Sequence, residues 1–342
     1  MTTELYPYDY NGVPDTHDEI QDHSNEQRWL INEIIRPELP NIIDNVEKCV
    51  EGLYSDQTFK MPLSNSTAGN SVLGPTIKGI ITRQGTNVLD FQIALSFPEF
   101  KKGKPTIYRM NTGVKFSLYQ LEYIGKNLQT ILELLEDLEI EEDTELFLEK
   151  FRSVLSVITQ SINVLENPPK NLIFPFDNNF AMKQMFQGYG ELSESNHHEI
   201  SLEIVLVKNE LCIDFRNLEK VTKKPWCNID LETKKSLVDK IKEALKVDRD
   251  KTLSETLREN DVHLEEPGLI TNLMISTFNR ESTTLQQAQA FIARCITYNG
   301  KVVIETEKIS VTTSDPTLIS ITSKLSSIER SISNHFTNLE VA

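Results

Sequence analysis

Leu121–Leu138, which reads "LEYIGKNLQTILELLEDL", is the stretch that decides the fold. Its apolar side chains form two series with a spacing of seven, the second offset by three: Leu121, Leu128 and Leu135, then Ile124, Ile131 and Leu138. This is the a/d spacing that lines one side of an α-helix in a coiled coil or a helical bundle. We therefore expect a long helix whose apolar stripe needs a partner.

Three other segments carry a similar stripe. Apolar residues recur every three or four positions over 148–165, directly after the acidic turn "EIEEDTE", and the short link predicts an antiparallel helical hairpin. The same spacing runs through 26–53, where Pro37 and Pro40 predict a kink or a break because each removes a backbone donor. It returns at the end of the chain, over 318–339.

The last of these helices has a well-marked start. Asp315 is a favourable N-cap and Pro316 suits the first helical position, while His335 fills one apolar slot further on. Each stripe would expose apolar surface to water if it stood alone. We favour one antiparallel bundle formed within the chain, because three heptads are short for an isolated two-stranded coil. The alternative is a zipper that joins two chains.

Between the helices, the sequence alternates as strands do. In "LDFQIALSF", Leu89–Phe97, apolar and polar residues alternate, which is the period of a half-buried strand. Glycine and asparagine at tight links, above all Asn299-Gly300, indicate hairpin turns. Three hairpins are predicted, over 77–97, 200–215 and 290–313. Residues 55–75 and 170–198 are expected to be irregular.

These patterns predict an α+β fold in which a discontinuous antiparallel helical bundle is joined to a β-rich lobe of antiparallel hairpins. Residues 1–24 are expected to be a flexible acidic tail. The expected bundle domain takes in 25–54, 115–168 and 315–340. The expected β-rich domain takes in 55–114 and 169–314, with a charged insertion at about 219–290 that contains one short helix.

Charge and composition narrow the class of protein. The formal net charge is −16, which disfavours nucleic acid and direct adsorption to anionic lipid. No apolar run approaches the ~20 residues that span a bilayer, and the first residues lack the basic and apolar regions of a secretory signal. We expect a cytoplasmic protein with reduced cysteines and no direct membrane insertion.

The sequence gives no sign of a cofactor or a catalytic site. Only 13 glycines occur, and none are grouped as a phosphate cradle requires. His197 and His198, followed by Glu199, are the one histidine pair, but neighbours on an extended chain point in opposite directions and cannot easily share a metal. Cys212 has no evident base nearby. We therefore predict no catalytic, metal or cofactor residues.

Several residues leave two interpretations open. Trp226 is either an exposed anchor for a partner or a buried core residue. The acidic turn at 139–145 is either a docking tip or a solvated turn, and His335 is either a pH-sensitive position in the bundle or an ordinary terminal histidine. The four cysteines are most simply small apolar residues. Which residues bind partners is not indicated.

The order of these elements resembles the Rogdi family. In that family, a strand with a Lys-Gly start leads to an alternating strand, an arginine-containing strand and a long helix; here the counterparts are Lys78-Gly79-Ile80, Gln84-Gly85, Tyr108-Arg109 and Phe116–Gln120. A downstream hairpin at Ile204–Leu218 and the Asn299-Gly300 hairpin before a terminal helix also match. The long charged segment and the acidic tail differ from animal members and suit a fungal one.

The resemblance implies a non-catalytic subunit of the RAVE complex, the regulator of the ATPase of vacuolar and endosomal membranes. It implies a role in V-ATPase assembly, in which the soluble V1 sector rejoins the membrane Vo sector. The implied partners are the large propeller-containing RAVE subunit, V1 subunits and, through the complex, an SCF-type adaptor. The protein would be a monomer within this hetero-complex, recruited peripherally to vacuolar and early endosomal membranes.

Two other functions stay open at this point. One is a coiled-coil tether or adaptor in endosomal or vesicle traffic, with the stripes pairing with other chains. The other is an enzyme with an unrecognised site, for which His197, His198 and Cys212 would have to converge in space.

Overall fold

A computed structural model describes residues 24–65, 74–176, 181–193, 197–248, 250–264 and 283–341. The chain separates into two compact units. The helical unit comprises Met1–Ser55, Tyr119–Glu166 and Pro316–Ala342, and the β unit comprises Asp56–Leu118 and Asn167–Asp315. Almost all of the expected acidic tail lies outside the described residues, and its flexibility stays a prediction.

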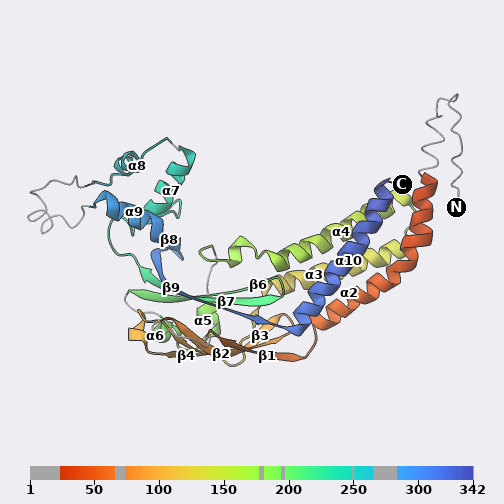
Figure 1. Cartoon of the computed structure of the whole chain (residues 1–342), viewed down its shortest axis with the longest axis horizontal. Helices are drawn as coiled ribbons and strands as arrows, with labels where there is room; N and C mark the ends of the chain where they lie inside the picture. Colours follow the sequence, from red (N-terminus) through yellow and green to blue (C-terminus); the bar gives the residue numbers. More distant parts are fainter. Residues whose placement is uncertain are drawn as a thin grey trace, which may run out of the picture. The chain divides into compact units, whose positions relative to one another are not determined.

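The helical unit is a four-helix bundle. Its helices are α2 (Leu39–Leu53), α3 (Tyr119–Ile140), α4 (Thr144–Glu166) and α10 (Pro316–Val341). They form a ring in which α2 packs on α3, α3 on α4, α4 on α10 and α10 on α2, and neighbouring helices run antiparallel (Figure 1). The predicted bundle, assembled from the middle and the end of the chain with a helix near its start, is confirmed.

The apolar stripes meet inside this ring. The α3 stripe is the predicted one and is buried from end to end, with Leu128, Ile131 and Leu135 fully covered. In α4 the predicted stripe is confirmed at Phe151, Ile158 and Leu165. It is wrong at Leu148, Leu155 and Ile162, which are only half-buried. The buried line is Phe147, Phe151, Val154, Ile158, Ser161 and Leu165. Small Ser161 faces the bundle, where its hydroxyl accepts a hydrogen bond from Asn127 Nδ2 at 2.9 Å.

The two prolines near the start of α2 change the type of helix without ending it. Residues 24–29 are α-helical, Leu30–Ile35 (η1) form a π-helix and Arg36–Glu38 (η2) a 3-10 turn that contains Pro37. Pro40 lies in the first turn of α2, where a proline is tolerated. The predicted disturbance is therefore present as a change in hydrogen-bond spacing.

The β unit contains two antiparallel sheets. The first sheet has the order β1 (Thr58–Ser64), β2 (Thr76–Gln84), β3 (Asn87–Ser96), β4 (Thr106–Arg109), and β5 (Phe116–Ser117) pairs with β3. The second has the order β6 (His198–Val207), β7 (Glu210–Lys220), β9 (Lys301–Ser314), β8 (Cys295–Tyr298). Their inner faces pack together, with the Phe91 and Phe215 ring centroids 6.2 Å apart.

Two predictions about this unit were wrong. Residues 58–64, expected to be irregular, form edge strand β1, in which Met61 and Leu63 face the core; Pro62 is tolerated because an edge strand has one unpaired side. Residues 290–294 are not part of a hairpin but end helix α9 (Leu285–Arg294), whose Ala- and Gln-rich sequence favours a helix. The hairpin itself begins at Cys295 and turns at Asn299-Gly300, both at positive φ.

Short helices complete the β unit. The segment 170–198, expected to be irregular, contains η4 (Lys170–Leu172), α5 (Ala181–Met185) and α6 (Tyr189–Ser193), and a further short helix, η3 (Lys101–Gly103), follows β3. The charged segment forms α7 (Leu237–Val247), as predicted, and α8 (Leu253–Glu259), which was missed. With α9, these helices enclose a small apolar cluster around Trp226, and part of the segment lies outside the described residues.

Candidate functional site

The histidine pair and Cys212 do not come together. His198 Nδ1 is 3.0 Å from Asn217 Oδ1, and both side chains lie on the face of the second sheet that carries Ile200. Cys212 pairs with Val205 and points to the opposite face. Seven residues of strand separate His198 from Val205, about 23 Å at ~3.3 Å per residue. These residues therefore form no joint site.

The thiols are poorly suited to nucleophilic chemistry. Burial raises the pKa of Cys49 to about 11 and that of Cys295 to about 11. Burial also raises the pKa of Cys212, and the nearby carboxylates of Glu210 and Asp214 raise it further. A raised pKa keeps a thiol protonated near neutral pH, and the thiolate is the reactive form.

The described residues also show no assembled metal or membrane site. Among them, no group of three or more His, Cys, Asp or Glu side chains is placed to hold a metal ion. Within the same residues, no helix has both the length and the apolar character to cross a bilayer.

The outward face of the second sheet carries a buried charge cluster around Arg216. Its guanidinium lies 2.7 Å from Asp214, 3.1 Å from Glu203 and 3.1 Å from Glu305, measured between nitrogen and oxygen. The ring of Phe174 covers the guanidinium at 4.8 Å, and the Phe174 N–H donates to Glu203. The guanidinium and the carboxylates pair with one another beneath the segment that contains Phe174. They are therefore not available to bind another molecule.

A second buried ion pair lies within the β unit and joins Asp315, which follows β9, to strand β2. Arg83 Nε donates to Asp315 Oδ2 at 2.6 Å, and the two side chains are 1% and 0% exposed. The guanidinium also donates to the Gly85 carbonyl and lies over the Phe59 ring at 5.3 Å. Asp315 was singled out as an N-cap, but the pairing across 232 positions was missed.

Trp226 is a core residue. Its side chain is fully buried and stacks on Phe291 with ring centroids 5.0 Å apart and 10° between planes. The exposed-anchor interpretation is therefore wrong for the unbound chain. The ring is packed because α7, α8 and α9 close around it, which the charged sequence of the segment did not reveal.

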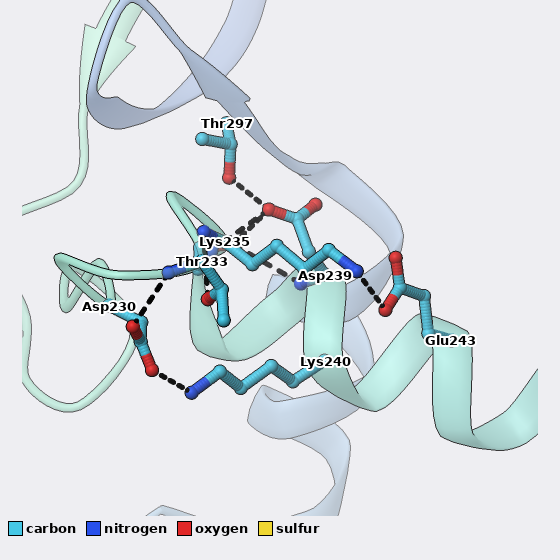
Figure 2. A network of polar contacts seen from close by, with 8 residues as sticks. Asp230, Thr233, Lys235, Asp239, Lys240, Glu243 and Thr297 are labelled. Atoms are coloured by element: carbon cyan, nitrogen blue, oxygen red, sulfur yellow. Dashed lines mark hydrogen bonds and ion pairs between the residues drawn. The ribbon is translucent and has the colours of Figure 1, made fainter.

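A polar network fastens α7 to the second sheet (Figure 2). Asp239 accepts from Ser236 in a capping box and from the Thr297 hydroxyl on β8. Burial alone would raise the pKa of Asp239, but the hydrogen bonds from Thr297 and Ser236 outweigh it and hold the pKa below the usual value. Nearby, the Lys240 ammonium at 2.6 Å and two backbone N–H groups hold the pKa of Asp230 low.

The other two open positions both lie in the bundle and have partners. His335 Nε2 lies 2.7 Å from Glu38 Oε2, between α10 and the turn that precedes α2. In the acidic turn, Lys150 pairs with Glu141 at 2.9 Å and lowers the pKa of Glu141, while Arg36 donates to the Glu139 and Glu141 carbonyls. Asp143 accepts from Leu146 N at the start of α4. Much of this turn is therefore structural.

The outward face of the first sheet is different, because its cations have no ion-pair partner in the part of the chain that the structure describes. We call it the open sheet face and define it by Lys60, Lys78, Ile80, Gln92, Ile107 and Arg109, all of which are exposed. Among the described residues, no carboxylate oxygen lies within ion-pair distance of Lys60, Lys78 or Arg109. Ile80 and Ile107 are 49% and 60% exposed.

A shallow hollow of about 350 Å³ lies at the centre of the open sheet face. It is lined by these side chains, by Asp90 and by the backbone around Gly79. A Cβ at position 79 would overlap the Gln92 carbonyl oxygen, so glycine is needed where β2 and β3 approach. The hollow and its unpaired cations are the feature of the β unit best placed to meet another molecule.

Comparison with known proteins identifies the family. The model of the family described as "Rogdi leucine zipper containing protein" matches residues 26–340. The chain belongs to the Rogdi family. A Saccharomyces cerevisiae relative named "Regulator of V-ATPase in vacuolar membrane protein 2" is 47% identical over 342 residues, covering 99% of this chain and 97% of the relative. In this Rogdi protein, Leu121, Leu128 and Leu135 of the α3 stripe are buried within one chain.

Proposed function

We propose that this Rogdi protein is a non-catalytic subunit of a V-ATPase assembly complex, the RAVE complex, and promotes the return of the V1 sector to the Vo sector. The observation that supports this most strongly is the 47% identity across almost the whole chain to a protein named as a regulator of V-ATPase. At this coverage, both units have counterparts in the relative.

The structure suits a scaffold. The reactive candidates of the sequence are separated, the thiols have raised pKa values, and buried charges are consumed in internal pairs. The proposed partners are the large propeller-containing subunit, V1 subunits and an SCF-type adaptor through the complex. We propose that the protein acts from the cytoplasm as a monomer within this complex, at vacuolar and early endosomal membranes.

The alternative of a coiled-coil tether loses its main argument. That function needs apolar stripes that are free to pair with other chains. Here Leu128, Phe151 and Leu325 are fully buried within the bundle. Opening the bundle for an external helix would expose the other three stripes.

A pull-down tests the proposed function. The full chain, tagged in its native cells, is isolated from cultures with and without glucose, and bound proteins are identified by mass spectrometry. We expect V-ATPase subunits, enriched in one of the two conditions. Deleting the chain should reduce the V1 subunits recovered on vacuolar membranes. Absence of V-ATPase subunits in both conditions, together with normal V1 recovery after deletion, would contradict the proposal.

A further inference from the structure

We propose that the open sheet face binds an acidic segment of a protein partner that also carries aliphatic side chains. This inference deepens the proposed function, on which it rests, because it assigns the scaffold a docking surface and states the chemistry of what docks there. Three observations support this inference: the positive charge of the open sheet face, its exposed apolar side chains and the spacing of its cations.

The charge of this face is opposite to that of the molecule. The chain has 51 acidic and 35 basic residues, yet the open sheet face has Lys60, Lys78 and Arg109 against Asp90 alone. The Asp90 carboxylate is engaged by Gln92 Nε2 at 3.2 Å. The three cations therefore keep their hydrogen-bonding capacity for carboxylates from outside, which form short, charge-assisted bonds.

The exposed isoleucines explain why the partner segment must also be aliphatic. Ile80 pairs with Gln92, and Ile107 pairs with Ala94, so the two isoleucines lie on opposite sides of β3. They flank the hollow, and the cations stand around them. An apolar centre with a polar margin is the usual composition of a protein–protein interface.

The cations are spaced for a short peptide segment. The strand register places Lys60 on β1, Lys78 on β2 and Arg109 on β4. With strands about 4.8 Å apart and a rise of ~3.4 Å per residue, their Cα atoms are roughly 12–16 Å from one another. An extended segment of about five residues covers this distance. Carboxylates near the two ends of such a segment and on one side of it would contact the three cations. An aliphatic residue between them would contact the exposed isoleucines.

A protein partner fits these observations better than a lipid surface. Three cations and one carboxylate give a small positive patch on a molecule of net charge −16. An anionic membrane would meet the repulsion of the remaining surface, whereas a short segment meets only the patch. The lipid surface is therefore an outcome of the test.

Site-specific photo-crosslinking tests the location and the chemistry together. In the full chain, expressed in its native cells, p-benzoylphenylalanine replaces Ile80 or Ile107, and in control chains it replaces exposed Ile140 or Leu231. We expect crosslinks from positions 80 and 107 to one protein segment with at least three Asp or Glu within about six residues. No protein crosslink from either position, or one to a segment without acidic residues, would overturn the proposal.

Charge reversal with a matched control tests the electrostatic argument. K60E/K78E/R109E is compared with K115E/K126E/K246E, which changes the net charge equally at exposed lysines elsewhere. We expect capture of the crosslinked partner to fall about tenfold or more in the first variant and to stay within about twofold in the second. Changing three acidic residues of the partner segment to lysine should restore capture by the first variant. Equal loss in both variants would overturn the proposal.

Two controls separate the explanations. If the wild-type chain captures V-ATPase subunits and K60E/K78E/R109E captures them equally, the inference fails and the proposed function stands. If the wild-type chain captures none, the proposed function fails, and crosslinking still decides whether an acidic segment binds. Flotation with phosphatidylserine-containing vesicles completes the test: recovery of the wild-type chain but not of the reversed variant would show a lipid surface and overturn the proposal.

Discussion

The outward faces of the two sheets use similar side chains in opposite ways. On the second sheet, Arg216 is 6% exposed, is surrounded by carboxylates and lies under Phe174. On the first sheet, Lys78 and Arg109 are exposed and have no carboxylate partner among the described residues. In both places the cation stands at an alternate position of an antiparallel strand.

This comparison distinguishes charges that stabilise the fold from charges that are free to bind a partner. A buried ion must be paired, because removing it from water costs more than a single contact returns. Arg216 and its carboxylates therefore depend on each other. An exposed, unpaired cation contributes little to folding, so its removal should matter only to what binds there.

The largest expected effect is loss of the buried cation. Arg216→Met leaves Glu203 as a poorly exposed carboxylate without its cation, and leaves Asp214 paired with the more exposed Lys308 alone. We expect the free energy of unfolding of the β unit to fall by about 3–5 kcal/mol. Urea titration can follow Trp226 fluorescence in a Trp29→Phe background, because the chain has 2 tryptophans and Trp226 is the one in the β unit.

Lys78→Met is the matched control for this experiment. It removes a strand cation from the open sheet face and should change the free energy of unfolding by less than about 0.5 kcal/mol. Similar losses in Lys78→Met and Arg216→Met would break the comparison, because the exposed cation would then also serve the fold.

The Arg83–Asp315 pair offers a sharper version of the same test. Arg83→Met leaves a carboxylate that is 0% exposed, whereas Arg83→Met with Asp315→Asn removes both charges. We expect the double variant to be less damaged than the sum of the single variants, with a coupling of about 1–3 kcal/mol. Strictly additive losses in a double-mutant cycle by urea titration would show that the pair contributes nothing as a pair.

Local patterns were sufficient to predict the bundle and most strands. The spacing of Leu121, Leu128 and Leu135 requires a helical partner wherever the helix lies, so the burial of these residues followed from the sequence. β1 was missed because Pro62 argues against a strand, and only its edge position removes that objection. Edge or centre is a property of the sheet and cannot be read from one strand.

The difference between the outward faces of the two sheets was not predictable for a related reason. Arg216 and Lys78 both stand at polar positions of alternating strands, and the sequence around each is similar in kind. The first is buried because Phe174 covers that face, and the second is exposed because no described segment covers its sheet. Similarly, Trp226 lies in a strongly charged segment, and its burial depends on three short helices that close around it.

Asp239 is intermediate between the two kinds of charge. It is half-buried and holds the start of α7 to Thr297. Asp239→Asn should lower the free energy of unfolding by about 1 kcal/mol at pH 7, the usual effect of a lost capping interaction. Because folding lowers the pKa of Asp239, its charge stabilises the fold above the unfolded value of about 3.9.

The pH dependence of that difference provides the check. As the pH falls below about 4 and through the lower folded pKa, the wild-type carboxylate also becomes protonated, so its advantage over Asp239→Asn should shrink. Urea titrations at pH 7, 5 and 3.5 measure this. A difference that stays constant, or grows, at acidic pH would mean that shape and not charge holds α7.

A small effect is also expected when the three open cations are removed together. K60M/K78M/R109M should unfold within about 1.5 kcal/mol of the wild type, the sum of three small surface effects. The NaCl dependence of the difference should match that of K115M/K126M/K246M, because both variants make the net charge more negative by the same amount and neither loses an internal ion pair. Urea titrations at low and high NaCl measure both quantities. A larger loss that salt reduces would show that the cations contact unseen carboxylates within the chain, and the open sheet face would then belong with Arg216. If the free energy of unfolding is almost unchanged, any loss of partner capture by this variant must come from the changed open sheet face, because the fold is as stable as in the wild type.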